Sequence, residues 1–104
     1  MPIKNVPEKG FYYHYKHDDG KDVCNYSYEV MGTALHTEDR TYTVIYRPLY
    51  VNRFLDGADF CSRPYDMFMG DVDLGNGPVP RFRKIEDPNA IARLKEISKE
   101  MYGA

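Results

Sequence analysis

The chain has 104 residues, of which 42% are hydrophobic and 29% are charged, and its formal net charge is −2 with a pI of about 5.9. This length predicts a single domain, 1–104, with one modest core, and the composition excludes a disordered chain. The acidic balance disfavours nucleic acid and anionic lipid as partners, because the protein as a whole has no basic field that attracts phosphates.

The sequence contains no segment with the pattern of a signal peptide or a membrane span. Residues 1–10 are polar and lack an apolar stretch, and the longest apolar run, at 44–51, is interrupted by an arginine and a proline. We therefore expect a cytoplasmic protein. Cys24 and Cys61 are not spaced as a redox or zinc pair, so we expect free thiols.

Alternating aromatic and β-branched residues predict the first three strands. In chain order, the predicted elements are a strand at 11–16, a loop at 17–25, a strand at 26–36, a hairpin connection at 37–40 and a strand at 41–46. Gly32 is expected to interrupt the second strand as a bulge or a bend, and Pro48 to restrict further pairing after the third.

The second half of the chain has shorter strands and more turns. The predicted elements are a loop at 52–59, a strand at 60–63, one helical turn at 64–69, a turn-rich segment at 70–80 and a strand at 81–86.

A helix is predicted at the C-terminal end of the chain. Asp87 is a suitable N-cap, Pro88 suits the first helical position and Gly103 is a natural stop. Apolar residues at helical spacing form a stripe that we expect to dock on the open side of the sheet: Ala90, Leu94, Ile97 and Met101. Together the elements predict a mainly β domain of five to six short strands, a small barrel or roll at 10–86, with one C-terminal α-helix at 87–104.

Five blocks of the sequence, in order, carry a more specific signal. They are GFYYHYK at 10–16, YEVMGTALH at 28–36, VIYRPLY at 44–50, RPYDMF at 63–68 and VPRFRKI at 79–85. The chain resembles the uncharacterised family catalogued as domain of unknown function 1653. The resemblance implies a compact SH3-like barrel or roll and no particular activity. The polar loop at 17–27 is longer here than in the simpler family pattern.

Two histidines, His14 and His36, lie within the resembling blocks. A histidine can act in general acid–base catalysis because it titrates near neutral pH. A small hydrolase-like enzyme that uses His14 or His36 is therefore one alternative, although no recognisable catalytic set accompanies either residue. The other interpretation is that each imidazole satisfies backbone groups in the sheet. No ligand spacing indicates a metal, and no motif indicates a cofactor.

Arginines that follow or precede aromatic residues and prolines form the more informative set. Guanidinium groups stack on aromatic rings and bind carboxylates or phosphates through paired hydrogen bonds. We predict that a concave surface brings together some of these arginines with nearby tyrosines and a histidine. The predicted ligand-binding residues are Tyr12, His14, Tyr46, Arg47, Arg63 and Arg81. The competing interpretation is that these arginines pair with Asp and Glu side chains inside the fold, since the chain has 16 acidic residues.

The sequence therefore favours a non-catalytic binding module over an enzyme. The expected partner is a small anionic, aromatic or nucleotide-like ligand, or another protein. Binding of single-stranded nucleic acid is a second alternative, which the acidic pI disfavours.

Overall fold

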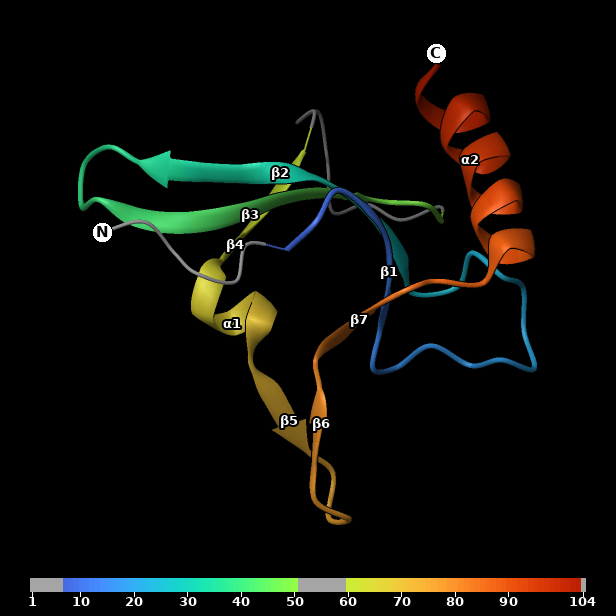
Figure 1. Ribbon diagram of the computed structural model, residues 1–104, viewed down its shortest axis with the longest axis horizontal. Coiled ribbons are helices and arrows are strands. Elements are labelled where there is room, and N and C mark those ends of the chain that lie inside the picture. Colours follow the sequence, from blue (N-terminus) through green and yellow to red (C-terminus); the bar gives the residue numbers. More distant parts are fainter. Residues whose placement is uncertain (1–6, 51–59, 104) are drawn as a thin grey trace.

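The structure is a computed structural model that describes residues 7–50 and 60–103 (Figure 1). The predicted loop at 52–59 lies outside the described residues. The elements are β1 (Gly10–His14), β2 (Ser27–His36), β3 (Thr41–Pro48), β4 (Cys61–Pro64), α1 (Tyr65–Met69), β5 (Asp71–Asp73), β6 (Pro78–Pro80), β7 (Phe82–Lys84) and α2 (Pro88–Tyr102).

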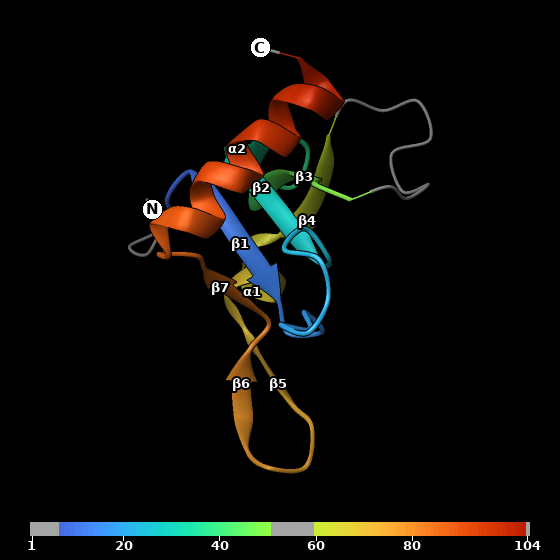
Figure 2. The same ribbon diagram turned by 90° about the vertical axis from the view of Figure 1, so that its right-hand side faces the viewer.

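Five of these strands form one curled antiparallel sheet. Its order is β4-β3-β2-β1-β7, and β5 and β6 form a separate two-stranded hairpin. Figures 1 and 2 both show the hairpin extending away from the sheet, while α2 lies on one face of it. The prediction of a mainly β roll with one C-terminal helix is confirmed.

A β-bulge bends β2 near its middle. Val30 pairs with Tyr46 and Gly32 pairs with Ile45, so Met31 is the extra residue in the ladder. Gly32 has a φ of 154°, which a residue with a Cβ rarely adopts. The predicted interruption at Gly32 is therefore a bulge, and bulges increase the local twist of a sheet.

Alternation along the strands produces two hydrophobic clusters, one on each face of the sheet. In β1, Phe11 and Tyr13 face α2, whereas Tyr12 faces the other side. The cluster under α2 contains Phe11, Tyr13, Leu49, Ile85 and Leu94. The cluster on the opposite face contains Tyr12, Tyr28, Val30, Val44, Tyr46, Phe68 and Phe82.

The helix α2 begins and ends where the sequence predicts. The Asp87 side chain accepts a hydrogen bond from the Asn89 N–H, and the Gly103 N–H donates to the Lys99 carbonyl. The predicted stripe is wrong at Met101, whose side chain is 40% exposed. No helix in the described ranges is long and apolar enough to cross a membrane.

Polar contacts explain why α2 is rotated away from Met101. The buried Ser98 hydroxyl donates to Glu29 of β2, and the Tyr102 hydroxyl donates to the Pro48 carbonyl at the end of β3. The residues of the last turns that face the sheet are therefore Ser98 and Tyr102.

The segment predicted as turns at 70–80 contains the hairpin of β5 and β6 instead. Val72 pairs with Val79, and Gly75 and Gly77 in the connection have φ values of 104° and 99°. The sequence does not predict β6 as a strand because it has a proline at each end, and proline is rare in paired strands. Val79 is the single residue of β6 that has a backbone N–H to donate.

Candidate functional site

The predicted site residues Tyr12 and Tyr46 lie together on the sheet face opposite α2. Both belong to the buried aromatic cluster, and each is only 7% exposed. Both rings contact Phe68 of α1, at centroid distances of 5.6 and 6.0 Å. Tyr12 and Tyr46 are therefore part of the hydrophobic core on this face, and their rings are too buried to stack on a ligand.

Arg63 covers the edge of this aromatic cluster. It lies in the edge strand β4, and its Nε donates to the Tyr46 hydroxyl at 3.3 Å. Its guanidinium lies over the Phe82 ring, 5.4 Å from the centroid. Within residues 7–50 and 60–103, no carboxylate forms an ion pair with Arg63.

His14, at the end of β1, lies on the same face of the sheet. Its ring is 5.1 Å from that of Phe82 and 5.8 Å from that of Tyr26. Burial lowers the pKa of His14 from 6.5 to about 4, and the positive charges of Arg63, Lys16 and Arg81 act in the same direction. His14 is therefore neutral at physiological pH and has cations around it.

The backbone fixes which nitrogen of the neutral His14 ring carries the proton. The Lys16 N–H donates to His14 Nδ1 at 3.2 Å, so Nδ1 is an acceptor and the proton is on Nε2. The ring thus presents an N–H donor at its free edge.

Arg81 connects the hairpin to β7. Its N–H donates to the Gly70 carbonyl, and its own carbonyl accepts from the Tyr15 N–H, so the backbone at Arg81 is anchored on both sides. The Arg81 Nε is buried, and no acceptor for it exists in the part of the chain that the structure describes. Such an unpaired donor is uncommon in native proteins.

Tyr26 is a contributor that the sequence did not reveal. It precedes β2 with a φ of 49° and is 38% exposed, and its ring lies beside those of His14 and Tyr50. The left-handed backbone turns the ring toward His14, and no local pattern signals this conformation. We call the surface formed by His14, Lys16, Tyr26, Arg63 and Arg81 the arginine face.

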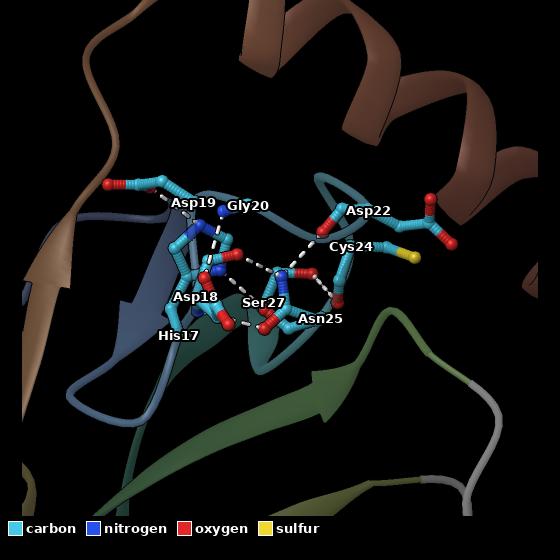
Figure 3. Close-up of polar contacts among 8 residues, drawn as sticks. All are labelled: His17, Asp18, Asp19, Gly20, Asp22, Cys24, Asn25 and Ser27. Carbon is cyan, nitrogen blue, oxygen red and sulfur yellow. Dashed lines mark hydrogen bonds and ion pairs between the residues drawn. The ribbon is translucent and has the colours of Figure 1, made fainter.

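The loop that carries Tyr26 is held by its own polar contacts (Figure 3). The Asn25 amide accepts from the Asp18 N–H and donates to the carbonyls of Asp18 and Asp22. The His17 ring stacks on Tyr13 at a centroid distance of 3.6 Å, and its Nδ1 lies 2.6 Å from the Asn25 carbonyl. The polar loop at 17–25 is therefore held together by its own hydrogen bonds, and it leads into Tyr26 of the arginine face.

Arg47 lies on the other side of the sheet, away from the remaining predicted residues. Its Nε and Nη2 donate to Glu29 Oε1 at 3.0 and 2.9 Å, and its Nη2 also donates to Ser98. Its guanidinium lies 4.1 Å from the centroid of the Tyr102 ring. Arg47 joins the sheet to α2, so we do not include it in the candidate site.

His36 does not join His14. It ends β2 at the hairpin to β3, and its exposed ring contacts Asp39 at 3.3 Å. The free thiols of Cys24 and Cys61 pack against different hydrophobic clusters. In the described ranges, no three His, Cys, Asp or Glu side chains are placed to hold a metal ion.

The fold and this surface define a small β domain with a cationic and aromatic patch on one face of a curled sheet. The chain belongs to the family described as protein of unknown function (DUF1653), whose model matches residues 10–84. The resemblance seen in the five sequence blocks is thus confirmed.

A solved structure supports the same assignment. The chain is similar to the crystal structure of a DUF1653 protein from Bordetella bronchiseptica, with 31% sequence identity and a TM-score of 0.59. The similarity covers 75% of this chain and 86% of that chain. No curated protein matches the chain.

Proposed function

We propose that the protein is a non-catalytic binding module whose arginine face takes a molecule with both an anionic group and an aromatic ring, such as a nucleotide. The observation that supports this proposal is the buried Nε of Arg81, which has no acceptor among the described residues. Arg63 lies on the same face without a carboxylate partner in those residues. An oxyanion from a ligand supplies an acceptor for the Arg81 guanidinium and a counter-charge for Arg63.

The state of His14 favours binding over catalysis. A general base needs a free lone pair, but His14 Nδ1 already accepts from the Lys16 N–H. The protonated Nε2 is a donor, and the low pKa of His14 keeps the ring neutral. His14 therefore suits a ligand oxygen that accepts a hydrogen bond.

Tyr26 suits the aromatic part of the ligand. Tyr26 is 38% exposed, and the rings of His14 and Tyr50 lie 5.8 and 5.7 Å from its ring. Stacking on such a ring contributes about 1–3 kcal/mol to the binding of a base. The arrangement therefore favours a flat ring with an anionic substituent.

Three matched compounds test the proposal: adenosine monophosphate, inorganic phosphate and adenosine. We expect the monophosphate to raise the melting temperature most, because it engages both the arginines and Tyr26. Phosphate alone should bind more weakly, and adenosine alone should have the smallest effect. Titration calorimetry measures the affinities directly.

Two variants and one control assign the effect to the arginine face. Arg63→Gln and Arg81→Gln should each weaken binding of the monophosphate by about tenfold, because a charge-assisted hydrogen bond is lost. Arg40→Gln, at the exposed tip of the β2–β3 hairpin, should bind like the wild type. Equal binding by all three variants, or no binding by the wild type, would contradict the proposal. Binding only of single-stranded oligonucleotides, with a steep salt dependence, would assign the face to nucleic acid instead.

A further inference from the structure

A groove that shares Tyr26 with the arginine face lies between α2, the loop before β2 and residues 49–50 after β3. Its volume is about 610 Å³, within the range of small-molecule sites. Figure 2 shows α2 in front of β1 and β2, with the loop beside the helix. The lining residues that matter here are Cys24, Tyr26, Leu49, Tyr50, Ile97 and Met101.

The floor and walls of the groove are mainly apolar. Leu49 is fully buried, whereas Tyr26 and Met101 expose 38% and 40% of their surface at the lip. Figure 3 shows the Cys24 thiol pointing away from the polar contacts of the loop, on the side of α2. A methionine at the lip can adapt its shape to an occupant, because its side chain is flexible and polarisable.

The charges at the rim compensate one another. Lys21 and Asp22 are adjacent and both line the groove, and Arg93 forms an ion pair with Glu96 at 3.1 Å. Among the described residues, the charges at the rim therefore balance once Glu96 is counted, in contrast to the arginine face. A charged occupant would lose its hydration against apolar walls, and each described charge at the rim already has an opposite charge beside it.

We propose that this groove binds a small uncharged aromatic molecule, whose ring lies against Leu49, Ile97 and Met101 and whose polar group remains at the rim. The apolar walls, the size of the cavity and the neutral rim all match this class of ligand. The proposal does not depend on the function proposed for the arginine face.

A set of three isosteric probes tests the charge of the ligand: naphthalene-2-carboxamide, naphthalene-2-carboxylate and naphthalene-2-carboxamidinium. Binding is followed in the full chain by the backbone amide shifts of a ¹⁵N-labelled sample. We expect the carboxamide to shift the amides of Leu49, Tyr50 and Ile97. It should bind about tenfold more tightly than either charged probe, because an unpaired charge is costly against apolar side chains.

Met101→Lys tests the position of the ligand. Its side chain is exposed and near the C-terminus of α2, where a cation is tolerated, so the fold should be retained. The ammonium at the lip should weaken carboxamide binding by about tenfold. The matched control is Leu74→Lys, in the β5–β6 connection, where the side chain is 63% exposed. This variant should bind the carboxamide like the wild type.

Three results would overturn the proposal. The first is unchanged binding by Met101→Lys, and the second is a preference for the carboxylate with shifts at Arg63 and Arg81. The third is a concentration-dependent rise in sedimentation coefficient that Met101→Lys abolishes, which would assign the groove to a second copy of the chain. The nucleotide test depends on Arg63→Gln and Arg81→Gln and the groove test depends on Met101→Lys, so failure of either proposal is recognised separately.

Discussion

At the scale of single residues, Tyr46 and Arg47 show how one strand serves two environments. They are neighbours in β3, so their side chains point to opposite faces of the sheet. Tyr46 accepts a hydrogen bond from Arg63 beneath the arginine face. Arg47 contacts Glu29 and Ser98 under α2. The two residues therefore have different consequences when they are changed.

Arg47→Ala should lower the free energy of unfolding by about 2 kcal/mol, because it leaves the largely buried Glu29 carboxylate without its partner. Guanidinium unfolding curves measure this change. Arg63→Gln is the comparison, since Arg63 pairs with no described carboxylate, and it should cost less than about 1 kcal/mol. Equal losses in the two variants would show that Arg63 is also a structural residue.

The ionisation of His14 gives a prediction for the pH dependence of stability. Burial and neighbouring cations lower its pKa from 6.5 in the unfolded chain to about 4 in the folded one. Between these values the unfolded chain binds more protons, so the contribution is complete above pH 6.5 and is lost as the pH falls toward 4. We expect a loss on the order of 1 kcal/mol, after discounting the shift for solvent screening of a half-buried ring.

The variant His14→Gln isolates this contribution. Its unfolding free energy should fall less steeply than that of the wild type between pH 6.5 and 4, because the variant lacks the His14 imidazole whose pKa differs between the folded and unfolded chain. Thermal or guanidinium unfolding at several pH values measures the slopes. Parallel slopes would show that His14 has the same proton affinity in both states.

At the scale of elements, the docking of α2 depends on a few side chains. Leu94 is fully buried between the helix and the sheet, whereas Met101 is 40% exposed on the same helix. Leu94→Ala should cost about 2–3 kcal/mol, and Met101→Ala should cost less than about 0.5 kcal/mol. Chemical unfolding distinguishes the two. A small loss for Leu94→Ala would mean that α2 contributes little to the stability of the sheet.

The sequence predicts elements where the signal is local. The Asp87 cap, the stop at Gly103 and the bulge at Gly32 all depend on residues within a few positions. The hydrogen bond between Glu29 and Ser98 joins positions 69 residues apart, so no local pattern reveals which helix face meets the sheet. Helical spacing alone does not reveal this distant contact, so it predicts a buried Met101 where the structure has an exposed one.

The site was predictable in composition but not in geometry. The predicted set contains both Tyr46 and Arg47, which cannot share a face of one strand. The Tyr and Arg surplus nevertheless indicates Arg63 and Arg81, whose positive charges both act on His14, and their role in binding stays a prediction. Tyr26 was missed because its left-handed backbone conformation depends on the fold of the preceding loop.

At the scale of the whole molecule, the two clusters on the faces of one sheet predict a graded stability. Val30 and Val44 lie in the central strands and are 1% and 0% exposed, so their amides are protected by both clusters. The β5–β6 hairpin extends from the sheet, and Val79 is 39% exposed (Figure 2). Because β6 has prolines at both other positions, the hairpin has few ladder hydrogen bonds to break.

Native-state hydrogen exchange should therefore separate these regions. The protection factors of Val72 and Val79 should be at least about a hundredfold lower than those of Val30 and Val44, since the hairpin can open while the sheet stays folded. Low denaturant concentrations should accelerate exchange at Val30 and Val44 and leave Val79 almost unchanged, because local opening exposes little new surface. If all four valines exchange with the same protection and the same denaturant dependence, the hairpin unfolds only together with the sheet and the molecule is a single cooperative unit.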